Sequence, residues 1–150
     1  MAATTLSHQN ADLYISFLTE SDETSGEFAL ENLLPHLDYL WPEVYKHTEN
    51  ILSLYMSPTF PQKELAAYFL AKVYYYMEDF ESSMEYILES GPHFDITKRD
   101  GFTDCLLAKC IDKYIALRKQ KDMEGLSQNN VNELVSFNKG HSINYINKKK

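Results

Sequence analysis

The sequence predicts an all-α fold: a stack of helical hairpins, an α-solenoid or rod, with six or seven helices and a tetratricopeptide-like pair in its middle. Three observations favour it. Apolar residues recur at helical spacing along most of the chain, and no segment alternates with period two. Five Gly and five Pro in 150 residues are few for a sandwich or barrel, which needs turn residues every ~8–12 positions. A hydrophobic content of 44% is enough for a core.

The first expected helix covers residues 10–18, with Asn10 as its candidate cap. Its apolar positions are Leu13, Tyr14, Phe17 and Leu18. A polar, acidic loop is expected over residues 19–26. Thr24 followed by Glu27 fits a capping box for the second helix. The apolar stripe of that helix is Leu30, Leu33, Leu34 and Leu37.

The third helix is expected to open at Trp41-Pro42, since proline is tolerated in a first turn. Its apolar face is Val44, Thr48, Ile51, Leu52 and Tyr55, and its polar face is Glu43, Lys46, Glu49 and Asn50. Pro58 and Pro61 then end the helix.

Residues 65–77 are apolar on all sides except at Lys72, so this helix is expected to lie centrally. Thr59 and Gln62 can form its capping box. Asp79 is expected to cap a shorter helix that ends before Gly91-Pro92. The apolar face of that helix is Phe80, Met84, Ile87 and Leu88, and its wet side is Glu81, Ser82, Glu85 and Glu89.

These two helices match the spacing of a tetratricopeptide-like hairpin, through Leu70, Ala71, Tyr74, Phe80, Ser83 and Ile87. Small residues such as Ala71 and Ser83 let two antiparallel helices approach closely. Only one such unit is visible in the sequence. Because one unit cannot bury both of its faces, flanking helices are expected to stack on it.

The last long helix is expected over residues 101–119. One apolar row is Phe102, Leu106, Cys110 and Tyr114, and a neighbouring row is Leu107, Ile111 and Ile115. Residues 131–137 can add one short helix. We expect a helical rod domain over residues 1–120 and a polar, Asn- and Lys-rich tail over residues 121–150 that is largely disordered.

Charge, cysteine content and hydropathy bear on whether the protein binds nucleic acid, forms disulfides or spans a membrane. A formal charge of −8 disfavours a nucleic-acid partner, and Lys148, Lys149 and Lys150 form the only basic run. Cys105 and Cys110 lie about 140° apart on one expected helix, so they are expected to be small core thiols in a reducing compartment. No apolar run is long enough for a membrane span, and residues 1–21 lack the basic start of a signal peptide.

No arrangement of residues predicts catalysis, a cofactor or a metal. His8, His36, His47, His93 and His141 show no metal-ligand spacing. Glu20, Asp22 and Glu23 are the densest carboxylates, and a solvated loop explains them better than acid–base chemistry. The run from Tyr74 to Tyr76 points in three directions on a helix, so core and inter-helix contacts are favoured over a stacking groove.

Several segments resemble one known family. They are EFALENL (27–33), WPEV (41–44), ILSLY (51–55), LAAYFLAKVYYYMEDFESSMEYILESG (65–91) and LLAKCIDKYI (106–115). In order and spacing, residues 28–119 are similar to the N-terminal region of the largest non-ATPase subunit of the 26S proteasome regulatory particle, the subunit built on proteasome/cyclosome repeats. The Asn- and Lys-rich end departs from that family, in which a charged loop and further helices follow.

The resemblance implies a rod of stacked helices at the start of a longer scaffold. In the family, a ring of repeats follows, the subunit helps to join the base to the lid, and its far C-terminus holds a ubiquitin receptor. The expected role is therefore a non-enzymatic scaffold module in ubiquitin-dependent protein degradation, in the cytoplasm and nucleus, with base and lid subunits as partners and no nucleic acid or membrane. Which subunit and which helix face make the contact stay open, as does self-association through an open apolar end.

Two alternatives to the scaffold are considered. The first is a free-standing adaptor that grips peptide tails in a helical groove, but the helix over residues 65–77 offers only Lys72 to hold a terminal carboxylate. The second is an enzyme with an unrecognised site, for which no residue pattern speaks.

Overall fold

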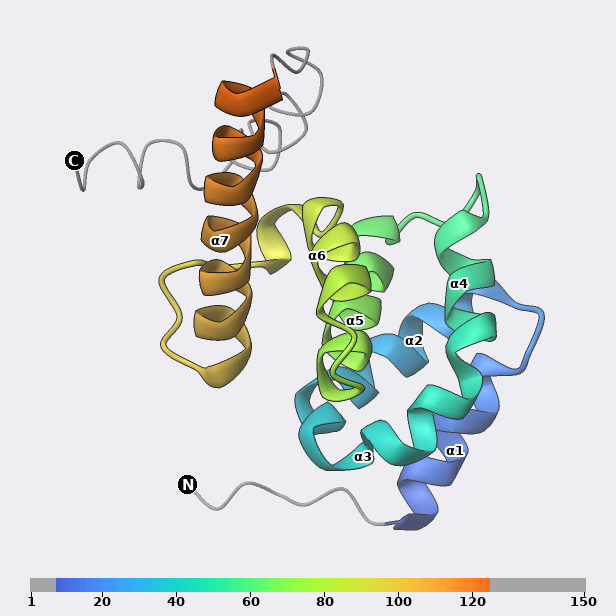
Figure 1. Ribbon diagram of the computed structural model, residues 1–150. Coiled ribbons are helices and arrows are strands. Elements are labelled where there is room, and N and C mark those ends of the chain that lie inside the picture. Colours follow the sequence, from blue (N-terminus) through green and yellow to red (C-terminus); the bar gives the residue numbers. More distant parts are fainter. Residues whose placement is uncertain (1–7, 125–150) are drawn as a thin grey trace. The chain divides into compact units, whose positions relative to one another are not determined.

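The computed structural model describes residues 8–124 and shows an all-α fold, as predicted (Figure 1). Over these residues it contains helices and no strand. The α-helices are α1 (His8–Leu18), α2 (Glu23–Leu33), α3 (Leu37–Val44), α4 (Thr48–Met56), α5 (Lys63–Tyr76), α6 (Phe80–Leu88) and α7 (Gly101–Glu124). Short 3-10 turns are η1 (Leu34–His36), η2 (Tyr45–His47) and η3 (Gly91–His93). The expected helix over residues 131–137 and most of the expected tail lie outside the described residues.

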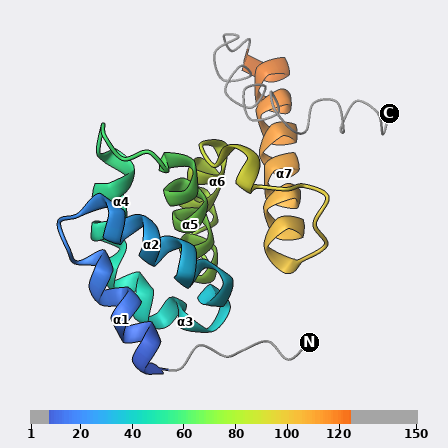
Figure 2. The same cartoon turned by 180° about the vertical axis from the view of Figure 1, so that it is seen from behind.

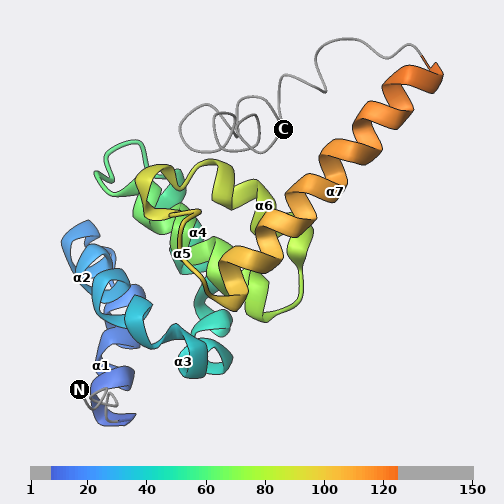
Figure 3. The ribbon, with the colours of Figure 1, turned by 90° about the vertical axis from the view of Figure 1, so that its left-hand side faces the viewer.

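The chain divides into two compact units, one ending at Ser90 and one beginning at Gly91. In the first unit, α1 and α2 lie side by side, and α4 and α5 form a second layer (Figure 3). The reverse view shows the same pairing of α1 with α2 (Figure 2).

Helix α5 is the centre of the first unit, as its all-round apolar sequence predicts. It packs against α2, α3, α4 and α6. Its buried residues are Leu65, Ala66, Ala67, Tyr68, Phe69, Leu70, Ala71 and Val73. Burying apolar area contributes roughly 25 cal/mol per Å², so this helix supplies much of the folding energy of the unit. Lys72, the polar exception, places its ammonium 5.8 Å from the centroid of the Tyr68 ring.

Helices α5 and α6 form the predicted hairpin. Ala71 and Ser83 are both fully buried where the helices meet, and the Ser83 hydroxyl donates a 2.6 Å hydrogen bond to the Ala71 carbonyl oxygen. Asp79 is the predicted cap, and its carboxylate accepts from the Ser82 backbone N–H at 3.1 Å. Met84 and Ile87 are buried as expected, whereas Leu88 is 37% exposed.

The N-terminal hairpin of α1 and α2 corrects three predictions. Asn10 is not a cap, because α1 begins earlier, at His8. Leu13 is exposed, and over residues 10–18 of α1 the buried residues are Ala11 and Leu18. The capping box of Thr24 and Glu27 does not form: Asp22 caps α2, and its carboxylate accepts from the Ser25 backbone N–H at 3.0 Å.

No helix begins at Trp41-Pro42, and the segment expected to form one helix is split between α3 and α4. Pro42 lies inside α3, and the turn η2 separates α3 from α4. Proline removes one backbone donor from α3, but the helix persists because Leu37, Leu40 and Val44 bury one continuous stripe. Six or seven helices were expected, and the observed helices differ from them in where one helix ends and the next begins. The predicted apolar face is otherwise confirmed by Val44 and Ile51, both fully buried.

The loop from α4 to α5 contains the expected break at Pro58 and Pro61, but not the expected capping box. Gln62 precedes α5 without a capping side-chain bond, and the Thr59 hydroxyl instead donates to the Glu23 carboxylate at 2.7 Å. Phe60, which no periodic pattern marks, is 2% exposed and belongs to the core of this unit.

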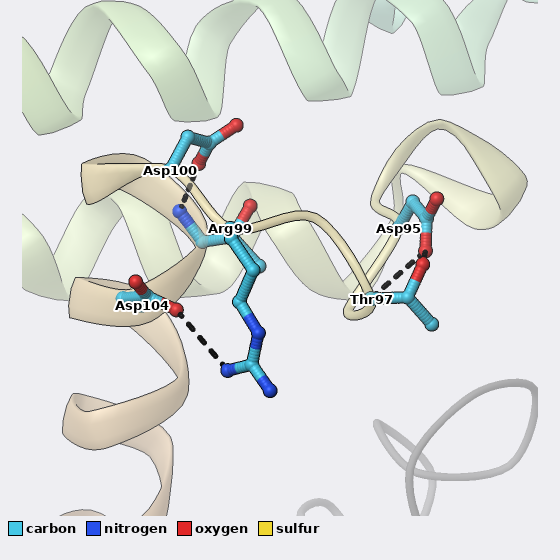
Figure 4. A network of polar contacts seen from close by, with 6 residues as sticks. Asp95, Thr97, Arg99, Asp100 and Asp104 are labelled. Atoms are coloured by element: carbon cyan, nitrogen blue, oxygen red, sulfur yellow. Dashed lines mark hydrogen bonds and ion pairs between the residues drawn. The ribbon is translucent and has the colours of Figure 1, made fainter.

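As far as residue 124, the second unit consists of η3, a polar loop and α7. Asp100 accepts from the Thr103 backbone N–H at 2.8 Å and so satisfies a free donor at the start of α7 (Figure 4). In the same loop Asp95 accepts from the backbone N–H of Thr97 at 2.9 Å. The Arg99 guanidinium lies 4.0 Å from Asp104, and both side chains are largely exposed, so this ion pair contributes little.

Helix α7 continues to Glu124, past the predicted end at Lys119. Phe102 and Leu106 are buried, but from residue 111 onward the residues of the two predicted apolar rows are exposed. Tyr114, Ile111 and Ile115 are 36%, 43% and 45% exposed. The periodicity therefore predicts the helix correctly and the burial of its second half incorrectly.

Candidate interaction surface

The first unit carries a chain of aromatic rings that joins four of its helical segments, α3, η2, α5 and α6. The Trp41 ring, from α3, is stacked on the Tyr76 ring at the end of α5, with centroids 6.3 Å apart and planes 9° from parallel. Tyr45, one helical turn after Trp41, has its ring centroid 6.2 Å from that of Trp41. Tyr75 lies 5.2 Å from Tyr76 and 6.1 Å from Phe80, at the start of α6.

We call the set of Trp41, Tyr45, Tyr75 and Tyr76 the aromatic face. Tyr45 is 41% exposed, and the other three side chains are half-buried. Each ring therefore has one part fixed against its neighbours and another part available to solvent. Such rigid, partly exposed aromatic side chains are enriched where proteins bind one another, because they offer much contact area at little conformational cost.

A second aromatic cluster lies between α4, α5 and α6. Tyr74 and Tyr86 stack with centroids 5.5 Å apart and planes 4° from parallel, and Tyr55 meets Tyr86 edge to face at 5.6 Å. Burial is the main cause that raises the pKa of all three phenols, with smaller contributions from nearby acidic groups. Each of these phenols therefore holds its proton more firmly than an ordinary tyrosine, which is itself neutral at pH 7.

The prediction for the run of three tyrosines is confirmed. Tyr74 contacts α6, Tyr75 contacts the start of α6, and Tyr76 contacts α3. All three make contacts between helices, and two of them, Tyr75 and Tyr76, also share the aromatic face. Sequence reasoning did not find the aromatic face itself, although the spacing of Trp41 and Tyr45 by one helical turn was a usable signal.

Of the three clustered carboxylates, Asp22 and Glu23 have structural roles, whereas Glu20 is exposed. Asp22 caps α2, and Glu23 accepts hydrogen bonds from the hydroxyls of Ser57 and Thr59. These bonds, Ser57 first, lower the pKa of the Glu23 carboxyl. A general acid needs the opposite shift. The cluster is thus a polar link between the start of α2 and the loop after α4.

The histidines and cysteines were the residues considered in the sequence as possible metal ligands. His36 packs beside Tyr39, with ring centroids 5.8 Å apart. Cys105 and Cys110 are not joined in a disulfide. Both are half-buried, whereas the sequence predicted core positions for them. Within residues 8–124 no three His, Cys, Asp or Glu side chains are placed to hold a metal ion. His141 and the three terminal lysines lie outside the described residues.

No helix in the part of the chain that the structure describes has the length and apolar character to cross a membrane.

Comparison with known proteins gives one consistent family. The model of the N-terminal domain of the 26S proteasome subunit RPN2 matches residues 9–137. A 26S proteasome non-ATPase regulatory subunit 1 of Drosophila melanogaster is 38% identical over 104 residues, 69% of this chain and 10% of that protein. The protein of the same name in Dictyostelium discoideum is 39% identical over 106 residues, 70% of this chain and 11% of that protein.

The 26S proteasome regulatory subunit RPN2 of Saccharomyces cerevisiae is 32% identical over 101 residues, which are 67% of this chain and 11% of the yeast protein. The chain therefore spans about a tenth of the length of the curated relatives that it matches.

Proposed function

Since this chain belongs to the family of the N-terminal domain of the 26S proteasome subunit RPN2, we propose that it is a scaffold module of the proteasome regulatory particle. In this role it contacts neighbouring subunits and serves ubiquitin-dependent protein degradation without catalysing a reaction itself. The observation that carries the proposal is the family match over residues 9–137, which includes nearly all of the described helical unit centred on α5.

The arrangement of the first unit supports a scaffold role. Helix α5 is covered by four other helices, so the unit has its own core and can hold a surface in a fixed shape. Its polar clusters are occupied by caps and links between segments, and the relatives it matches are named as non-ATPase regulatory subunits. Binding through such a surface would come mainly from a few aromatic anchors.

The partners proposed are other subunits of the base and the lid. The test is affinity purification of the tagged chain from its own cells, followed by mass spectrometry of what co-purifies. We expect regulatory-particle subunits to be recovered. A chain that is folded, as shown by circular dichroism, and that recovers none of them would overturn the proposal. Ala71→Trp, which should disrupt the α5–α6 hairpin, is the matched negative control.

A peptide-binding adaptor remains the competing function that this experiment must separate. Titration with peptides that carry an acidic C-terminus provides the second arm. Saturable binding at low micromolar concentration, without recovery of proteasome subunits, would favour the adaptor. The position of Lys72 over the Tyr68 ring argues for the scaffold, because a clamp needs cationic side chains that reach a carboxylate.

The proposed site of action is the cytoplasm and the nucleus. Free thiols at Cys105 and Cys110 fit a reducing compartment. Imaging of the fluorescently tagged chain should show both compartments. Exclusive accumulation in a secretory organelle would contradict this assignment.

A further inference from the structure

The aromatic face lies in a strongly acidic part of the chain. Residues 1–90 contain fifteen Asp and Glu, three Lys and no Arg, and the difference is a formal charge of −12 with His neutral. Two of the three lysines have assigned partners: Lys46 is 3.0 Å from Glu43, and Lys72 lies over the Tyr68 ring. A field of this sign attracts cationic segments and repels acidic ones.

Two exposed carboxylates lie within three residues of rings of the aromatic face. Asp38 is exposed and lies one helical turn before Trp41, so Asp38, Trp41 and Tyr45 follow one stripe of α3 and η2. Glu78 is exposed and comes two residues after Tyr76. One carboxylate thus lies close in sequence to each of the two stacked rings, Trp41 and Tyr76.

Glu78 also has an unusual backbone. Its φ is 62°, a left-handed conformation that glycine or asparagine adopts more readily than glutamate. The turn is closed by hydrogen bonds from the backbone N–H of Glu78 to the Tyr75 carbonyl and of Asp79 to the Tyr74 carbonyl, both at 3.0 Å. The position therefore keeps an anionic side chain where a glycine would be less strained, which points to a use for the charge.

A surface that combines aromatic rings with carboxylates favours the binding of cationic side chains. Arginine stacks on aromatic faces and pairs with carboxylates through a planar fork of donors, and lysine makes the weaker point-charge version of both contacts. An acidic segment would be repelled, and an uncharged apolar segment would leave Asp38 and Glu78 without counter-charges.

We propose that the aromatic face docks an extended, arginine- or lysine-rich segment of a partner protein, whose cationic side chains lie against Trp41, Tyr45 and Tyr76 and pair with Asp38 and Glu78. This inference deepens the proposed scaffold function and rests on it, because the segment would belong to a neighbouring subunit of the regulatory particle.

The test uses the fluorescence of Trp41, the single tryptophan of the chain, which reports directly from this face. The whole chain is titrated with a blocked peptide of alternating glycine and arginine at near-physiological salt. We expect a saturable change in Trp41 emission. A peptide of alternating glycine and glutamine should give none.

Matched variants separate docking on the face from general attraction to an acidic protein. Tyr45→Ala removes a ring of the face and should weaken binding of the arginine peptide about tenfold, the effect of a typical anchor residue. Tyr39→Ala removes a tyrosine of the same 41% exposure that packs on His36 instead, and binding should be unchanged. A double variant, Asp38→Asn with Glu78→Gln, should weaken binding and reduce its dependence on salt.

Each contrary result overturns the inference. Absence of a saturable signal, equal binding of the glutamine peptide, or equal binding by Tyr45→Ala and Tyr39→Ala would show that the face does not select a basic segment. Circular dichroism melting of each variant verifies that it is folded. If the chain enters the regulatory particle but does not bind the arginine peptide, the result contradicts the docking inference and leaves the proposed scaffold function unaffected.

Discussion

The hydroxyl of Ser83 donates a 2.6 Å hydrogen bond to the carbonyl oxygen of Ala71, and both residues are fully buried at the contact of α5 and α6. Neither helix has a large side chain at this point, so their backbones come close enough for a side chain of one to reach the main chain of the other. Two of the predictions below concern this contact, and two concern the polar bonds at the start of α2.

The first change is Ser83→Ala, which removes the donor and leaves a small apolar side chain in its place. A buried hydrogen bond contributes about 1 kcal/mol on balance, so we expect the free energy of unfolding to fall by about that amount in urea denaturation. Ser53→Ala is the control, because the Ser53 hydroxyl makes a comparable bond to the Glu49 carbonyl on an exposed helix face. Equal losses in the two variants would contradict the role assigned to the buried contact.

A bulky residue at Ala71 should be more harmful. Ala71→Trp places an indole where the two helices meet, and overpacking of this kind costs typically 1–3 kcal/mol or more. We expect a lower melting temperature, measured by circular dichroism. Ala116→Trp, on the exposed side of α7, introduces the same side chain without a neighbour to displace and should change stability little. An unchanged melting temperature for Ala71→Trp would show that the hairpin packs differently.

The start of α2 tests which residue is its cap. Asp22→Ala removes the acceptor for the Ser25 backbone N–H, and loss of an N-cap costs about 1 kcal/mol. Thr24→Ala should be close to neutral, because Thr24 is exposed inside the first turn and makes no cap bond in the described structure. Denaturant melts of the two variants decide between them, and a larger loss for Thr24→Ala would restore the capping box.

Acidification should weaken the link between α2 and the loop after α4. The hydroxyls of Ser57 and Thr59 lower the pKa of Glu23 in the folded chain, so folding favours its ionised form. That contribution is present above the unfolded pKa, near the ordinary value of 4.5, and is lost as pH falls through the lower folded pKa.

We therefore expect the melting temperature of the native chain to fall more steeply below about pH 4.5 than that of Glu23→Gln, which cannot ionise. Glu20→Gln, in the exposed loop before Asp22, is the control and should follow the native curve. Parallel curves for the native chain and Glu23→Gln would show that this carboxylate does not sense the fold.

Local patterns predicted the elements whose signals lie within a few residues. Asp79 stands directly before the apolar face of α6, where an aspartate favours a cap, and its carboxylate accepts from the Ser82 backbone N–H. The all-round apolar composition of α5 likewise predicted its central position, because a helix without a polar face is stable only when it is covered.

Links between distant segments were not predictable in the same way. Thr59 and Gln62 fit a capping box by local spacing, but the Thr59 hydroxyl bonds to Glu23, 36 positions away. Pro42 similarly fits the first turn of a helix, yet it lies inside α3 because that helix buries the stripe of Leu37, Leu40 and Val44. In the first case a hydrogen bond to a distant segment outweighed the local preference, and in the second the burial of an apolar stripe did so.

The sequence by itself determined the all-α class, the central helix, the small residues of the hairpin and the resemblance to a proteasome scaffold family. Periodicity and composition act along the chain, and helices form wherever an apolar stripe recurs at the right spacing. Only the tertiary structure decided which stripes are covered and which rings meet. Ile111 and Ile115 have the spacing of core residues but are exposed, whereas Trp41 and Tyr76, far apart in sequence, are stacked in one face. Burial depends on neighbours contributed by other segments, and no local pattern contains that information.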